Sequence, residues 1–123
     1  MSAISNGENG KNTVEKVRVL LFELDYLKQE NINLKNGLSR ALQGKLAGNF
    51  VEKAEEFQQM FINKDQVIDL FRHEVSTLMV ETPPEARNGK FSEKVVEMQQ
   101  EIEVLIACFW DMKTAFEKYL SEI

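Results

Sequence analysis

The chain has 123 residues, of which 43% are apolar and 28% charged, and its formal net charge is −5 at pH 7. A chain of this length folds as one domain around its own core. An acidic chain offers no basic footprint to nucleic-acid phosphates, a single cysteine forms no internal disulfide, and a single histidine excludes most histidine-based metal sites. We therefore expect no nucleic-acid partner, no metal ion and no other cofactor.

Residues 1–12 are mostly Ser, Asn, Gly and Glu, with little apolar content. They lack the basic start and the apolar stretch of a secretory signal, and the sequence has no run of about 18 apolar residues that would span a membrane. We predict a disordered tail over 1–12, no membrane span and a cytoplasmic location, which also suits the lone cysteine.

Apolar residues recur at alternating spacings of three and four along residues 13–43, as they do in an amphipathic α-helix. Thr13 suits the N-cap of this helix, and Gly44 and Gly48 mark its end and the link that follows. In heptad notation the a residues are Val17, Leu24, Asn31 and Leu38, and the d residues are Leu20, Leu27, Leu34 and Ala41.

This heptad is typical of a two-stranded coiled coil, in which a single Asn at an a position fixes the register and the number of strands. Two glutamates at g positions and two lysines at the following e positions would pair opposite charges between parallel chains. These charged residues are Glu23, Lys28, Glu30 and Lys35. We therefore predict a homodimer through this helix, with the interface candidates Val17, Leu20, Leu24, Leu27, Asn31, Leu34 and Leu38. The alternative is that the stripe packs only against the other helices of its own chain.

A second helix is predicted over residues 49–81, where Asn49 and Glu52 have the spacing of an N-terminal capping box. Its apolar stripe is broad, which indicates contact with more than one neighbour. Residues 63–66 have the composition of a new helix start, but the three-four register continues through them unchanged. We therefore predict one continuous helix. The stripe consists of Phe50, Ala54, Phe57, Phe61, Ile68, Phe71, Val75 and Leu78.

Residues 82–90 form the clearest loop, because two prolines and an Asn-Gly pair interrupt any helix. A third helix is predicted over 92–122, capped by Ser92. Three long helices with short links predict an all-α, up-down-up antiparallel bundle, which forms a single domain over 13–123 and dimerises into a larger bundle or coiled coil. The third stripe consists of Val95, Met98, Ile102, Leu105, Phe109, Met112, Phe116, Tyr119 and Ile123.

Few residues suit catalysis. Di-iron helical bundles need Glu-x-x-His pairs, but Leu70 stands three residues before His73, which we expect on the surface. Cys108 lies beside the core residue Phe109, where we expect an inert thiol that fills space among apolar neighbours. We therefore predict that the protein is not an enzyme.

Trp110 is the candidate partner-binding residue, because it is rotated about 100° from Phe109 and so lies off the core stripe. It either covers a neighbouring helix or a self-interface, or it stays open as an anchor for a partner protein. The acidic excess of the second and third helices is in turn either a solvated outer face or a docking surface for a basic partner.

The expected function is that of a non-enzymatic interaction or scaffold protein, which acts through its helix faces as a homodimer. The alternative is a small chaperone-like protein that holds a partner helix in an apolar groove between the second and third helices. The surplus of Phe and Met beyond a narrow stripe favours this alternative, because Met side chains suit adaptable surfaces.

Overall fold

A computed structural model of the protein describes the backbone of residues 5–44 and 48–122 and the side chains of residues 12–44 and 50–122. Within these ranges there are three α-helices, α1 (Ser5–Gly44), α2 (Gly48–Glu81) and α3 (Gly89–Ser121), and no strand. A short 3-10 helix, Pro84–Ala86, lies between α2 and α3. The predicted all-α bundle of three long helices is therefore confirmed.

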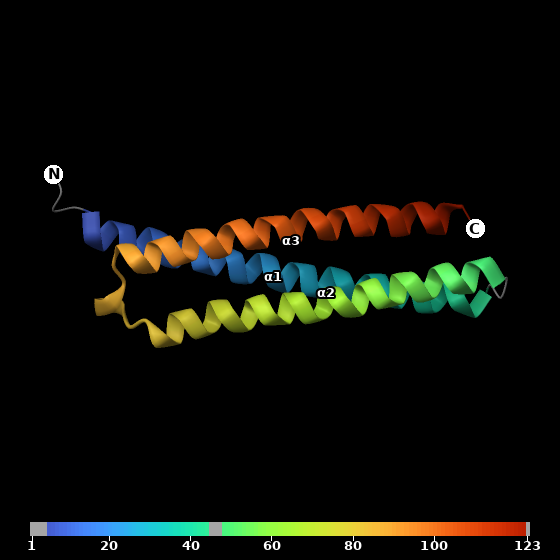
Figure 1. Cartoon of the computed structure of the whole chain (residues 1–123), viewed down its shortest axis with the longest axis horizontal. Coiled ribbons are helices and arrows are strands. Elements are labelled where there is room, and N and C mark those ends of the chain that lie inside the picture. Colours follow the sequence, from blue (N-terminus) through green and yellow to red (C-terminus); the bar gives the residue numbers. More distant parts are fainter. Residues whose placement is uncertain (1–4, 45–47, 123) are drawn as a thin grey trace.

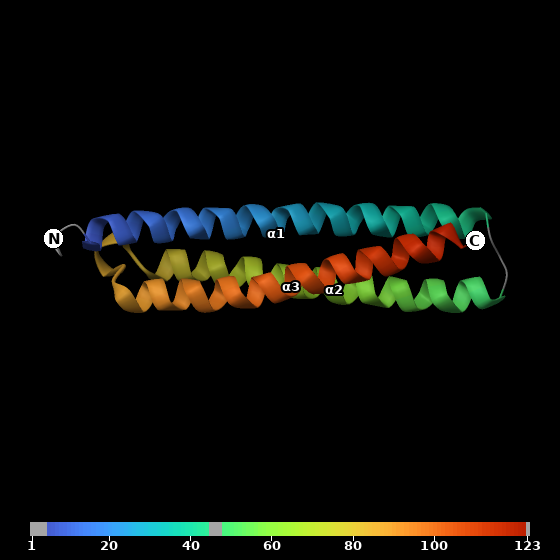
Figure 2. The same ribbon diagram turned by 90° about the horizontal axis from the view of Figure 1, so that it is seen from above.

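The three helices lie side by side along one long axis (Figures 1 and 2). α1 and α3 run in the same direction and α2 runs in the opposite one, as the up-down-up prediction requires. α1 contacts both other helices extensively, whereas α2 and α3 contact each other less. α1 is therefore the central element of the bundle, and its two sides form separate junctions with α2 and α3.

The start of α1 differs from the prediction. The helix begins at Ser5, so residues 5–12 are helical rather than part of a disordered tail, and residues 1–4 lie outside the described part. Thr13 is consequently inside the helix and not at its N-cap. It is buried, and its hydroxyl oxygen lies 3.0 Å from that of Ser92 on α3. The pair therefore joins the first turn of α3 to α1 about two turns after the start of that helix.

α2 continues without a break through residues 63–66, which confirms the prediction of one helix. It begins at Gly48, one position before the predicted start. The side chain of Asn49 and residues 45–47 lie outside the described part, so the predicted capping box and most of the predicted link lie there too.

The predicted cap of α3 is wrong. α3 begins at Gly89, and the side-chain oxygen of Asn88 accepts hydrogen bonds from the backbone N–H groups of Lys90 and Phe91. Asn88 has the extended backbone that an N-cap requires, with φ −105° and ψ −162°. The Asn-Gly pair that indicated a loop is thus the start of a helix, and Ser92 is free to contact α1.

The core is one continuous cluster drawn from all three helices. Aromatic rings fill the end of the bundle where α1 finishes and α2 begins. The ring centroids of Phe61 and Phe116 lie 5.0 Å apart in an edge-to-face arrangement, and the Tyr119 hydroxyl donates a hydrogen bond of 2.7 Å to the Phe50 carbonyl oxygen. Burial raises the pKa of Tyr119 above its ordinary value.

The heptad stripe of α1 packs inside its own chain. All seven predicted dimer-interface residues are buried against α2 and α3, with at most 8% of any of them exposed. A side chain that is buried inside its own chain cannot also pack against a second chain. For this helix the structure therefore shows the intramolecular alternative. The residues concerned are Val17, Leu20, Leu24, Leu27, Asn31, Leu34 and Leu38.

The charges that flank the stripe are also used within the chain. Lys28 Nζ lies 2.7 Å from a carboxylate oxygen of Asp69 on α2, and the same hydrogen bond is the main cause that lowers the pKa of Asp69. Lys35 pairs with Asp65 on α2. Glu30 instead pairs with α3, where its carboxylate accepts a hydrogen bond of 2.7 Å from Lys113. Three of the four charges predicted to pair between two chains therefore join α1 to its neighbours in one chain, and the fourth, Glu23, has no such pair among the described residues.

Asn31 fixes the register of α1 against α2. Its side-chain N–H₂ group donates to the Phe61 carbonyl oxygen at 2.8 Å and to an Asp65 carboxylate oxygen at 2.9 Å. Its own Oδ1 is buried and has no hydrogen-bond partner among the described residues. The polar position in the stripe is thus a specific contact between two helices of one chain.

Candidate partner-binding groove

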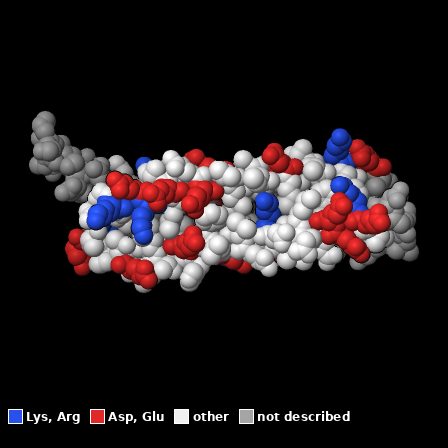
Figure 3. All heavy atoms as spheres, in the orientation of Figure 1, with Lys and Arg blue, Asp and Glu red and all other residues white. Residues whose placement is uncertain are grey.

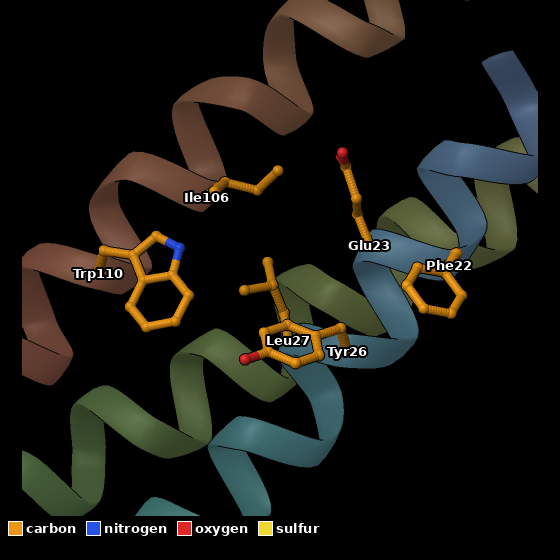
Figure 4. Close-up of a pocket in the computed structure, with 6 residues that line it drawn as sticks. All are labelled: Phe22, Glu23, Tyr26, Leu27, Ile106 and Trp110. Carbon is orange, nitrogen blue, oxygen red and sulfur yellow. The ribbon is translucent and has the colours of Figure 1, made fainter.

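An apolar groove runs between the parallel helices α1 and α3. One cavity is lined by four residues of α1 and two of α3, namely Phe22, Glu23, Tyr26, Leu27, Ile106 and Trp110. In Figure 4 the side chains of Ile106 and Trp110 extend from α3 toward those of α1. These residues meet because α1 and α3 share one direction and lie side by side.

A second cavity continues the groove toward the start of both helices. It shares Glu23 and Ile106 with the first and extends to Asn12 on α1 and Gln99 on α3. The α1 wall therefore runs from Asn12 to Leu27, which is roughly 22 Å at the rise of an α-helix. A groove of this length accommodates about four turns of another helix. We refer to the two cavities together as the α1–α3 groove.

The outer edge of the groove carries exposed aromatic rings. Phe22 is 74% exposed, Tyr26 49% and Trp110 38%, although aromatic side chains of this size contribute most to stability when they are buried. Val19, one turn before Phe22, adds a further exposed apolar side chain to the α1 wall, in the second cavity. A run of large apolar side chains at the rim of a groove is typical of an interaction site.

Trp110 is held in place although it is partly exposed. Its ring lies edge-to-face on Phe109, with centroids 5.8 Å apart, and 6.5 Å from the ring of Tyr26 across the groove. The Lys113 ammonium lies 4.7 Å from the indole centroid. The hydrogen bond from Lys113 to Glu30 is the main cause that raises the pKa of Lys113, so this cation is fixed beside the ring. Trp110 therefore presents one pre-positioned surface to the groove.

The sequence placed the groove of the alternative function between the second and third helices. The two cavities described above lie instead between α1 and α3, and the aromatic rings line the first of them. On the face formed by α2 and α3, charged side chains gather toward the two ends of the bundle and the middle carries few charges (Figure 3). Exposed Met60 on α2 accounts for part of the predicted surplus of Phe and Met.

Sequence reasoning found Trp110 but missed its partners on α1. Val19, Phe22 and Tyr26 follow one another at spacings of three and four, which is a second, shorter apolar stripe beside the heptad. That signal is present in the sequence. It is easily overlooked, because the longer heptad alone is sufficient to predict this helix.

The two residues considered for chemistry lie apart from the groove. His73 is exposed, as predicted, and lines a shallow hollow between α1 and α2 with Asp25, Asp69 and Arg72. Cys108 is exposed rather than packed among apolar neighbours, because its register places it on the outer side of Phe109. Among the described residues, no three His, Cys, Asp or Glu side chains are grouped as the ligands of a metal ion would be.

Comparison with known proteins adds no assignment, since no family model, curated protein or solved structure matches this chain. In the part of the chain that the structure describes, no helix combines the length and the apolar character required to cross a membrane.

Proposed function

We propose that this protein is a non-enzymatic interaction protein that holds an amphipathic helix of another protein in the α1–α3 groove. The observation that carries the proposal is the set of three exposed aromatic side chains, Phe22, Tyr26 and Trp110, at the rim of one continuous groove. Trp and Tyr are the side chains most often found as energetic anchors at the centre of interfaces.

The shape of the groove supports a helical occupant. Its walls are two parallel helices whose side chains repeat at helical spacing, and an amphipathic helix places its apolar residues at i, i+3, i+4 and i+7 to fit such a groove. Leu27 and Ile106 form an apolar base below the rim aromatics. An apolar helix face that covers this groove would bury the exposed rings. This burial would stabilise the complex by about 25 cal/mol for each Å² of apolar surface removed from water.

The alternative is a homodimeric scaffold, as the heptad of α1 first indicated. With that heptad buried in one chain, a homodimer requires another surface. The α1–α3 groove is a concave apolar surface whose walls also carry Glu23 and Glu103, so a protein of different charge suits it better than a second copy.

Site-specific photo-crosslinking in the native cell tests the proposal. A photoreactive phenylalanine analogue in place of Phe22 is expected to give an adduct with one other protein, and the crosslinked peptide is expected to be an amphipathic helical segment. The matched control carries the same analogue in place of Val80, an 83% exposed apolar residue on α2 outside the groove. If both positions give the same adducts, or position 22 gives none, the groove does not hold a partner helix.

A further inference from the structure

We propose that the occupant of the α1–α3 groove is an amphipathic helix with a basic polar face, from a protein other than a second copy of this chain. This inference rests on the proposed function, because it names the chemistry of the helix that the groove would hold.

Two carboxylates line the same cavity from opposite walls. Glu23 lies on α1 and is half-buried, and Glu103 lies on α3 and is exposed. Neither forms an ion pair or a hydrogen bond with another described side chain, whereas the other acidic side chains of α1 that the structure describes, Glu15, Asp25 and Glu30, are all paired. A half-buried carboxylate without a partner carries a desolvation cost that a cationic ligand would offset.

The remaining charges on the walls leave this acidic character in place. Glu15 pairs with Arg18 at 2.7 Å, so that carboxylate is already neutralised. Lys16 is the basic side chain among the lining residues, and it lies on the part of α1 that precedes Glu23. Around the aromatic rim, Glu23 is the charged residue that lines the first cavity, and the Lys113 ammonium beside Trp110 is already paired with Glu30. The section of the groove that carries the anchors is therefore acidic and apolar.

A second copy of the chain fits this section poorly. In a two-fold symmetric pair the same surface patch meets itself, so Glu23 and Glu103 would approach the same carboxylates of the other copy. Like charges at short range disfavour such a pair, and the net charge of −5 adds a weaker repulsion at long range. A helix with Lys or Arg on both sides of its apolar stripe would instead place one cation against each wall.

The single tryptophan of the chain supplies the readout, because Trp110 lies in the groove. The probes are two designed helical peptides of about 15 residues, a length that matches the groove. Both lack Trp and Tyr and carry leucines on one face. They differ only in the polar face, which consists of Lys in one peptide and of Glu in the other. Titration of the full-length protein is expected to shift the Trp110 emission to the blue with the Lys peptide at lower concentration than with the Glu peptide.

Charge reversal locates the effect. In the double variant Glu23→Lys and Glu103→Lys, the Lys peptide is expected to bind about 2- to 30-fold more weakly, which is the range for two exposed ion pairs. The matched control, Glu52→Lys with Glu55→Lys, makes the same change in net charge at exposed positions at the start of α2. This control is expected to weaken binding much less.

Each contrary outcome overturns a different statement. If neither peptide changes the Trp110 emission, the groove holds no such helix and the proposed function fails with the inference. If both peptides bind equally, or the groove and control variants weaken the Lys peptide equally, the basic partner is wrong while the groove remains a helix-binding site. If the emission shifts with protein concentration alone, the occupant is a second copy and not another protein.

Discussion

Phe109→Ala is expected to lower the free energy of unfolding by about 3–5 kcal/mol, which is the usual cost of truncating a fully buried phenylalanine. Phe109 has none of its surface exposed, and it belongs to the core cluster that joins the three helices. Truncation removes its apolar burial and leaves a cavity that long, continuous helices cannot easily close. Chemical denaturation followed by circular dichroism measures the change.

Phe22→Ala is the matched control, because it makes the same chemical change at a side chain that is 74% exposed. It is expected to cost under about 0.5 kcal/mol, as surface substitutions usually do. Comparable losses in the two variants would mean that Phe22 is buried in solution. That result would remove the open groove as well as the assigned register of α1.

Asn31→Asp is expected to destabilise the protein by about 3–5 kcal/mol at neutral pH, the range seen when a buried charge lacks compensation. The side chain of Asn31 is fully buried and donates to the Asp65 carboxylate. A carboxylate at this position would replace that donor with a second negative charge beside Asp65, whose nearby cation, Lys35, is already paired. The free energy of unfolding from urea titrations at several pH values tests this.

The pH dependence distinguishes charge from shape. Burial and the neighbouring Asp65 would raise the pKa of the new carboxylate in the folded state above its unfolded value. The destabilisation should then be absent below the unfolded pKa, grow as the pH rises and stay constant above the folded pKa. Asn31→Leu, of similar size and uncharged, is expected to change stability by no more than about 1.5 kcal/mol at any pH, because it loses two hydrogen bonds but also the unpartnered oxygen. Equal losses for both variants would exclude the electrostatic explanation.

Periodicity was sufficient to predict the three helices and almost the whole core, because each stripe repeats over many turns. The continuous helix through residues 63–66 followed from the same register. The ends were harder to predict. Asn88 caps α3 through two local hydrogen bonds, and an Asn-Gly pair is equally typical of a turn, so sequence alone did not separate these outcomes. The early start of α1 at Ser5 lies in a stretch of poor helix formers, where propensity predicts the opposite.

The sequence did not show which helices each apolar stripe packs against. The heptad of α1 has the composition of a two-stranded coiled coil, but a helix packed between two others in one chain needs the same apolar stripe. Asn31 and the flanking lysines form a hydrogen bond and ion pairs with Asp65 and Asp69 on α2. They could form the same kinds of contact with a second chain. Only the three-dimensional arrangement distinguishes these two uses of one pattern.

The groove could be predicted in part. Trp110 lies off the apolar stripe of its helix, and this position alone predicts a partner-binding residue. Its neighbours Phe22 and Tyr26 lie more than eighty residues earlier in the sequence, on α1. They come together with Trp110 only because α1 and α3 are parallel and adjacent, which depends on the length of both connections and on the packing of α2.

One chain completes the helical bundle, and the α1–α3 groove is left open to another protein. Light scattering coupled to size-exclusion chromatography, at tens of micromolar protein, distinguishes this arrangement from a dimer. We expect the mass of one chain, 14.2 kDa, at every concentration loaded. A stable species with twice that mass would contradict the open groove, because a second copy would then occupy an apolar surface that we assign to a different partner.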